Sequence, residues 1–226
     1  MNVFITSFWG EGVSDERFLP GITQRVITSL LSECAQGEWD VYEPVILHSN
    51  ADSFVNQVLD IALKSKGYNA MFIHTDADAR NENESAIPHK IHPALEELSR
   101  QNDEFCKYLV PVIPVFKVEN WKLCDGDALR EALGVPLNNE EMGININIQT
   151  LEQRSGSKEM LRDILKMAKQ RSRFAPDAED IDYVLAKQIS LENLMRLTSF
   201  KAFVHRLKTT LISQNIITPN CDFFPV

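Results

Sequence analysis

The chain has 226 residues, 44% of them hydrophobic, which is enough for one large α/β core or for one domain with a helical annex. Its formal net charge of −9 argues against broad electrostatic adhesion to nucleic acid or to anionic membranes, although it leaves room for a local basic groove. No run of about 18 apolar residues occurs and the first residues do not resemble a signal peptide, so we expect a cytoplasmic protein without a membrane segment.

Short apolar runs alternate with amphipathic segments over the first half of the chain. The run 3–9 is short and rich in β-branched and aromatic residues, which indicates a buried strand. After Gly10-Glu11-Gly12 we expect a helix with Ser14 as its N-cap, kinked or restarted at Pro20-Gly21. Further strands are predicted at 41–47, 70–75 and 108–116, further helices at 52–64 and 93–100, and a polar loop at 80–89. Strands that alternate with helices pair in parallel, so we predict a Rossmann-like α/β fold, a mostly parallel sheet flanked by helices.

Beyond residue 119 the pattern becomes mainly helical. We predict helices at 119–133, 157–172, 178–187, 190–196 and 199–213. The exception is 144–148, where isoleucine and asparagine alternate strictly, as in a short edge strand or an extended linker. The sequence therefore predicts an α/β domain over residues 1–120 and a mainly helical C-terminal extension over residues 121–226 that packs on it.

Three acidic residues stand where two of the predicted strands end. Glu11 comes just after the first strand, and Asp76 and Asp78 come just after the third. The carboxyl ends of parallel strands lie along one edge of a sheet, where ligands of open α/β folds bind. Residues two apart on extended backbone point to the same side, so Asp76 and Asp78 can address one cation. Such oxygen ligands suit Mg²⁺, which needs only one or two carboxylates besides substrate phosphate.

Several of these residues also have a plain structural interpretation. An Asp-x-Asp pair after a strand is often a turn or a helix cap. Glu119 follows the fourth predicted strand and is either a ligand of a second metal ion or a carboxylate favoured by a helix dipole. His74 is either a buried histidine with one satisfied nitrogen or a group beside the metal. Trp121 either packs the following helix on the sheet or stacks a base.

Five basic residues recur at spacings of four, four, three and four, which places them on one face of a predicted helix. Such a stripe can track a nucleic-acid backbone, or it can be a solvated outer face. The five residues are Lys158, Arg162, Lys166, Lys169 and Arg173.

Other familiar motifs do not occur in the sequence. The cysteines are far apart, without the spacing of a zinc site or a redox pair, so we expect structural thiols at Cys34, Cys106, Cys124 and Cys221. The sequence has no Gly-x-x-x-x-Gly-Lys-Ser/Thr loop and no Gly-x-Gly-x-x-Gly after a strand. Any dependence on ATP must therefore come from a partner.

Two segments resemble motifs of the Toprim fold. The first motif of that fold is similar to residues 10–19, GEGVSDERFL, and its Asp-x-Asp motif is similar to residues 73–79, IHTDADA. The segment 112–121, which contains Glu119 and Trp121, resembles the Glu-x-Trp block of small bacterial Toprim-like proteins of poorly defined function. The region 157–203 resembles the helical tail of the same group.

This resemblance implies a metal site and a reaction. Toprim domains occur in topoisomerases, bacterial primases and nucleases of the OLD and RecR type. By resemblance, Glu11 would be a general acid/base or a ligand of one metal ion, and Asp76 and Asp78 would be the main ligands of Mg²⁺ or Mn²⁺. The metal would act as a Lewis acid on a phosphodiester and lower the pKa of a bound water. Such proteins are often encoded beside ABC- or AAA-type ATPases, in loci that resemble phage-defence systems, which implies an ATPase partner.

The sequence and the resemblance together predict a metal-dependent endonuclease, acting on DNA or RNA, whose activity an ATPase partner controls. A catalytically inactive Toprim-like binding or regulatory subunit is the first alternative. A nucleotidyl transferase or primase-like enzyme is the second, although a chain of 226 residues leaves little room for template-handling parts. A homo-oligomer is compatible with each of them.

Overall fold

A four-stranded parallel sheet forms the centre of the protein. The structure is a computed structural model, and it describes residues 2–144 and 147–221. Its strands lie in the order β4-β2-β5-β6, and their bounds are Val45–Ile46, Thr6–Trp9, Ala70–His74 and Leu109–Val112. A further parallel pair joins β1 (Asn2–Phe4) to β3 (Trp39–Val41). The predicted α/β class with a parallel sheet is confirmed.

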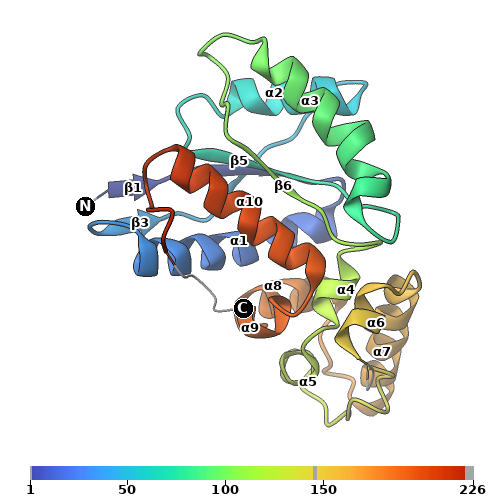
Figure 1. The fold of residues 1–226 in the computed structure, drawn as a ribbon. Coiled ribbons are helices and arrows are strands. Elements are labelled where there is room, and N and C mark those ends of the chain that lie inside the picture. The colour runs from blue at the N-terminus through green and yellow to red at the C-terminus, as the bar shows by residue number, and fades with distance from the viewer. Residues whose placement is uncertain (1, 145–146, 222–226) are drawn as a thin grey trace.

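Helices cover both faces of this sheet (Figure 1). On one face lie α1 (Val13–Cys34) and α10 (Thr198–Ser213), and on the other lie α2 (Phe54–Lys64) and α3 (His92–Ser99). Successive strand residues point to opposite faces, so Phe8 and Phe72 join the core beneath α1 and α10, whereas Trp9, Met71 and Ile73 join the core beneath α2 and α3. Strands β2, β5 and β6 are buried on both faces, which explains why most of their residues are apolar.

Two of the predicted strands are each split into two shorter ones. The run 3–9 is interrupted at Ile5, whose backbone N–H donates to the side chain of Asn69 at 2.8 Å instead of to a neighbouring strand. The run 41–47 is interrupted around Pro44, which has no N–H to donate. The predicted loop 80–89 contains the 3₁₀ turn η1 (Glu82–Glu84), and the π-helical turn η2 (Ile87–Ile91) follows and leads directly into α3.

Helix α1 differs from its prediction at two points. It runs through Pro20 as one helix, and its N-cap is Gly12, so the assignment of Ser14 as the cap is wrong. The Ser14 hydroxyl donates instead to Asp182 at 2.7 Å and accepts a hydrogen bond from Lys122 at 2.8 Å. These two buried side chains come from the C-terminal half of the chain, and local sequence gives no sign of them.

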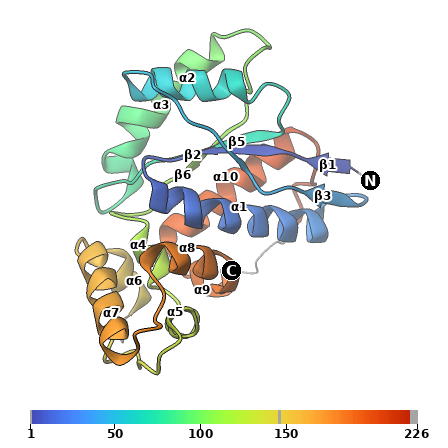
Figure 2. The same ribbon diagram turned by 180° about the vertical axis from the view of Figure 1, so that it is seen from behind.

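The second half of the described chain is helical, as predicted. Its remaining helices are α4 (Glu119–Lys122), α5 (Gly126–Leu133), α6 (Ile148–Glu152), α7 (Ser157–Arg171), α8 (Ala178–Gln188) and α9 (Leu191–Leu194). Helix α8 packs on α1 and α10 packs on β6, whereas α4 to α7 gather beyond one end of the sheet (Figure 1, Figure 2). The strand or linker predicted at 144–148 includes residues 145 and 146, which lie outside the described residues, and Ile148 begins α6.

Trp121 is a core residue. Its side chain is fully buried, its indole N–H donates to Ser199 at 2.9 Å, and its ring meets Phe200 edge-on at 5.0 Å. Of the two interpretations of this tryptophan, packing of the helix on the core is therefore the one that the structure supports. The contact ties α4 to α10 across 78 positions of sequence.

One pair of cysteines departs from the prediction of isolated thiols. Cys34 at the end of α1 forms a disulfide with Cys221, and their Cα atoms lie 5.5 Å apart. The two residues are 187 positions apart in sequence, so no local spacing could reveal the pair. Cys106 and Cys124 are free thiols. Within residues 2–144 and 147–221, no helix has the length and apolar character needed to span a bilayer.

A buried ion pair connects α4 and α8, and both of its residues also contact α1. The Lys122 ammonium lies 2.5 Å from an Asp182 carboxylate oxygen, and the two side chains are 1% and 6% exposed. Ser14 bridges them by its two hydrogen bonds. A buried charge that loses its partner is costly, because neither water nor another group replaces the lost interaction.

We therefore predict that Asp182→Ala lowers the free energy of unfolding by about 3 kcal/mol. The measurement is urea denaturation followed by circular dichroism. The control is Asp163→Ala, which breaks an ion pair with Lys166 whose side chains are both 62% exposed, and which should change stability by about 0.5 kcal/mol or less. Equal effects of the two variants would show that burial adds nothing to the Lys122 pair.

Candidate active site at the ends of two adjacent strands

The predicted acidic residues lie at a topological switch point of the sheet. After β2 the chain crosses to β4 on one side, and after β4 it returns to β5 on the other side of β2. Strands β2 and β5 are therefore parallel neighbours whose connections leave in opposite directions, which is where open α/β folds bind ligands. Glu11 follows β2 by two residues, and Asp76 follows β5 by two.

Glu11 reaches the strand end that carries the two aspartates. The Thr75 hydroxyl donates to Glu11 Oε1 at 2.7 Å, and the Lys90 ammonium donates to the same oxygen at 2.8 Å. Lys90 also lies 2.5 Å from the Thr75 hydroxyl oxygen. The first predicted carboxylate thus contacts the residue next to Asp76, and its charge is balanced by a lysine from η2.

Asp76 and Asp78 converge on one cation, which is the ammonium of Lys117. The Lys117 Nζ lies 3.2 Å from Asp76 Oδ2 and 2.6 Å from Asp78 Oδ1. The local geometry differs from the extended backbone assumed in the sequence analysis, because Asp78 has a φ of 50° and lies in the left-handed region. A sharp turn, not a straight strand, therefore brings the second carboxylate to the same charge.

His74 is buried directly behind the aspartates. Its Nδ1 is 3.0 Å from the carbonyl oxygen of Val112, and its Nε2 lies 3.4 Å from Asp15 Oδ2 and 3.8 Å from Asp76 Oδ1. Both interpretations of this histidine hold, because it is a buried histidine with one satisfied nitrogen and it also lies beside the acidic residues. The side chain of Asp15 is only 14% exposed.

Burial and neighbouring charges shift the pKa values of this group in opposite directions. Burial raises the pKa of Asp76 to about 6, although the charges of His74 and Lys117 oppose that rise. Burial alone would also raise the pKa of Asp15 and lower that of His74, but their mutual hydrogen bond and charge lower the pKa of Asp15 and raise that of His74. Burial would lower the pKa of Lys117 too, yet its contacts with Asp78 and Asp76 raise it.

The aspartate pair has the donor chemistry of a divalent-cation site. Asp76 Oδ1 is buried and has no hydrogen-bond partner among the described residues, so one carboxylate oxygen remains available. Two carboxylates together with substrate phosphate can satisfy Mg²⁺ or Mn²⁺. In the part of the chain that the structure describes, however, no group of three or more His, Cys, Asp or Glu residues could hold a metal ion. The fit is therefore to a two-carboxylate site, with Glu11 beside it.

Glu119 has no hydrogen bond or ion pair with Asp76 or Asp78 among the described residues. It is the first residue of α4, is nearly buried, and lines a second cavity of about 290 Å³ together with Ser14 and Lys122. Its position at the start of a helix agrees with the interpretation as a carboxylate favoured by the dipole. Lys158 and Arg162 line the same cavity, and the charge of Lys158 helps to lower the pKa of Asp15. This end of the basic stripe therefore approaches the candidate site.

The other end of the basic stripe is partly neutralised. Lys166 is paired with Asp163 at 3.1 Å, and Lys169 is paired with Asp177 at 2.8 Å. Arg173 lies beyond the end of α7, over the ring of Phe174, so the helix does not present all five cations on one face. All five basic residues are exposed.

Neither lysine of this site was predicted from the sequence. Lys117 follows β6 along the same edge of the sheet as Asp76, so the position after a predicted strand could have indicated it. Lys90 lies in η2, and its approach to Glu11 depends on the path of a turn that no residue pattern specifies.

No family model, curated protein or solved structure was found to match the chain.

The raised pKa of Asp76 leads to a prediction about stability and pH. Because the folded pKa is about 6 and the ordinary value is 3.8, the folded protein favours the protonated carboxyl. The stability that this preference contributes is present below about pH 4 and is lost as the pH rises through about 6. In metal-free protein, Asp76→Asn should therefore gain roughly 2 kcal/mol of stability relative to the wild type as the pH rises from about 4 to about 7.

Urea denaturation across this pH range measures the effect. Asp163→Asn is the matched control, because it makes the same chemical change on a side chain that is 62% exposed and has no contact with Lys117. Its stability difference from the wild type should vary little with pH. A difference for Asp76→Asn that stays constant with pH would show that burial does not control the ionisation of this carboxyl.

Proposed function

We propose that the protein is a metal-dependent nuclease that hydrolyses phosphodiester bonds of DNA or RNA at the edge formed by β2 and β5. The observation that carries this proposal is the convergence of Asp76 and Asp78 on one cation position beside Glu11, with one buried Asp76 oxygen unpartnered among the described residues. Asp76 and Asp78 would hold Mg²⁺ or Mn²⁺. When bound, the metal would polarise the phosphodiester and lower the pKa of a water molecule.

The remaining side chains of the site have complementary roles in this proposal. Glu11 is held by Thr75 and Lys90 at the neighbouring strand end, where its carboxylate can accept a proton from the attacking water. Lys90 and Lys117 supply positive charge for phosphate oxygens. His74 lies behind Asp76, where its ring and the Val112 carbonyl limit the orientations open to that carboxylate.

The more specific parts of the proposal depend on the resemblance described above. The resemblance of residues 10–19 and 73–79 to Toprim motifs supports a Toprim-type nuclease, and the gene neighbourhoods of similar proteins support an ABC- or AAA-type ATPase partner in phage defence. The exposed basic residues near Lys158 offer a path for a polynucleotide towards Asp15 and the candidate site.

A second candidate function is binding without turnover. It is favoured by the observation that Lys90 and Lys117 already pair with all three predicted carboxylates. If these ion pairs are permanent, the site is a neutralised charge network that stabilises the strand ends, and the protein is a binding or regulatory subunit.

Cleavage assays test the nuclease proposal. The purified chain, alone and with its proposed ATPase partner, should cleave plasmid DNA, single-stranded DNA or total RNA in Mg²⁺ or Mn²⁺ but not in EDTA. Glu11→Gln and Asp76→Asn should each lower the rate by at least about a hundredfold, because each removes a charged group from the reacting centre.

Asp163→Asn is the control for the cleavage assays. It makes the same chemical change as Asp76→Asn on an exposed helix face, and it should cleave at the wild-type rate. Cleavage that persists at the wild-type rate in Asp76→Asn would exclude this site as the reacting centre.

Metal affinity separates the two candidate functions. In the nuclease proposal Lys117 competes with the metal for Asp76 and Asp78, so Lys117→Met should bind Mn²⁺ roughly tenfold more tightly than the wild type. Isothermal titration calorimetry measures both affinities, and Lys166→Met on the exposed face of α7 is the control. If neither the wild type nor Lys117→Met binds Mn²⁺, the binding-subunit interpretation is favoured.

A further inference from the structure

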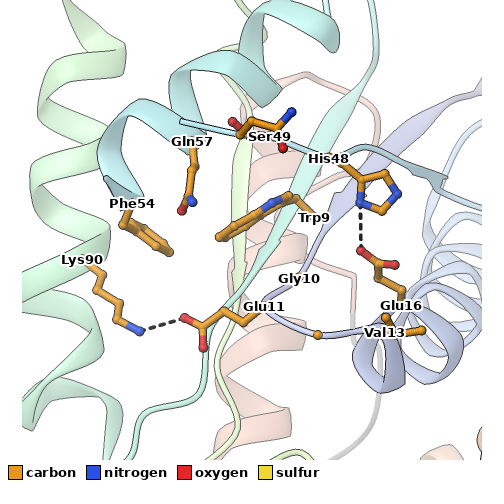
Figure 3. A pocket seen from close by; sticks show the side chains of 12 residues that line it. Trp9, Gly10, Glu11, Val13, Glu16, His48, Ser49, Phe54, Gln57 and Lys90 are labelled. Atoms are coloured by element: carbon orange, nitrogen blue, oxygen red, sulfur yellow. Dashed lines mark hydrogen bonds and ion pairs between the residues drawn. The ribbon is translucent and has the colours of Figure 1, made fainter. Parts of the chain in front are cut away.

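A cavity of about 630 Å³ opens beside Glu11, between the ends of β2 and β4 and the start of α2 (Figure 3). It shares Glu11 and Lys90 with the candidate active site. Trp9 lies across its middle, with Phe54 and Gln57 on the α2 side and Glu11 below (Figure 3). A ligand in this cavity would therefore lie next to the carboxylates without displacing them.

The charged groups of the cavity are paired with one another. Lys90 is 2.8 Å from Glu11, and His48 is 3.2 Å from Glu16 (Figure 3). Within the described part of the chain, Lys90 is the one lysine or arginine of the lining, and Glu11 already pairs with it. A phosphate or a carboxylate would have to break one of the pairs to bind here, whereas an uncharged ligand would not.

The polar groups that remain without partners are neutral. Trp9 is 7% exposed and lines the cavity, and its indole N–H donates to no group among the described residues, so this donor is available to a ligand. The Gln57 amide nitrogen donates to the Ala51 carbonyl at 3.0 Å, and its amide oxygen accepts no hydrogen bond from the described residues. Ser49 and Asn50 add further neutral polar side chains to the lining.

The apolar part of the lining includes an aromatic pair. The rings of Trp9 and Phe54 meet edge-to-face, with centroids 5.7 Å apart and an interplanar angle of 69°. The Lys90 ammonium lies 5.7 Å from the centroid of the Phe54 ring, so the cation covers one end of the aromatic wall. Aromatic walls with a few placed hydrogen-bonding groups are typical of sites for planar heterocycles.

We propose that this cavity binds one unpaired nucleobase of a single-stranded nucleic acid. The inference rests on the proposed nuclease function and narrows its substrate to strands whose bases are free to leave the stack. A base has the neutral, planar surface and the donor and acceptor edge that Trp9 and Gln57 would contact. With the base in the cavity, the adjoining backbone would pass along Glu11 and Lys90 towards Asp76.

Binding to oligonucleotides in EDTA tests the proposal without any cleavage. Fluorescence anisotropy should show binding of labelled single-stranded DNA or RNA oligonucleotides, and weaker binding of duplexes of the same length. Replacing every base of the strand with an abasic residue should weaken binding about tenfold or more, because stacking and edge contacts are lost while the phosphates remain. Equal binding of the abasic and normal strands would overturn the proposal.

Mononucleotides form a separate arm of the same experiment. They carry the same base without a strand, so competition by mononucleotides at millimolar concentration supports recognition of the base itself. Binding of mononucleotides with no binding of any oligonucleotide would overturn the assignment to a polynucleotide.

A matched pair of tryptophan variants locates the binding site. Trp9→Phe keeps an aromatic ring but removes the unpartnered N–H, and it should weaken oligonucleotide binding roughly fivefold. Trp39→Phe is the control, because the Trp39 indole N–H is also without a partner among the described residues but lies at the start of β3, at the opposite end of the strands. Equal affinities of Trp9→Phe and the wild type would place the base elsewhere.

These outcomes are independent of the cleavage assays. If the protein cleaves nucleic acid but binds abasic and normal strands equally, the nuclease proposal stands and the base-binding proposal is overturned. If the protein binds oligonucleotides through Trp9 but never cleaves them, the base-binding proposal stands and the binding-subunit interpretation is favoured.

Discussion

The parallel pairing of β2 with β5 is the constraint on which the rest of the site depends. The register sets Trp9 opposite Ile73, so the segments that follow the two strands emerge side by side. Neither segment could form its contacts alone, because the oxygen of Glu11 is held by Thr75, a residue 64 positions away. The apolar side chains on both faces fix this register, since a slip by one residue would exchange the faces. The packing of the core therefore determines which carboxylates meet.

Gathering acidic side chains at one edge carries an electrostatic cost, and the fold offsets it with cations from later segments. Lys90 comes from η2 and contacts Glu11, which follows β2, whereas Lys117 comes from the segment after β6 and contacts Asp76 and Asp78, which follow β5. His74 supplies a further group from within the sheet, fully buried between Asp15 and Asp76. Asp76 is the least balanced of these carboxylates, because its buried Oδ1 accepts no hydrogen bond from the described residues. A divalent cation would complete that balance, which is why the metal is proposed at Asp76 and not at Glu11.

The sequence predicted those features that depend on local patterns. Buried strands are apolar runs and amphipathic helices have a regular period, so the sheet, most helices and the strand ends carrying Glu11 and Asp76 could be predicted. Contacts across long separations could not. The role of Ser14 depends on Asp182, 168 positions away, and the Cys34 disulfide depends on Cys221. The lysine partners of the carboxylates belong to the same class, because many lysines are exposed and few residue patterns tell a paired one from a solvated one.

The distribution of charge also explains why two kinds of surface can lie together at this edge. On the β5 side the carboxylates need cations, and a phosphate accompanied by a metal ion would meet that need. On the β4 side Glu11 is already paired with Lys90, and Trp9 and Gln57 are among the neutral groups that line the cavity. A polynucleotide offers both chemistries at once, a charged backbone and neutral bases. A net charge of −9 is then no obstacle, because the metal would carry the attraction for phosphate and the cavity would require no positive charge to hold a base.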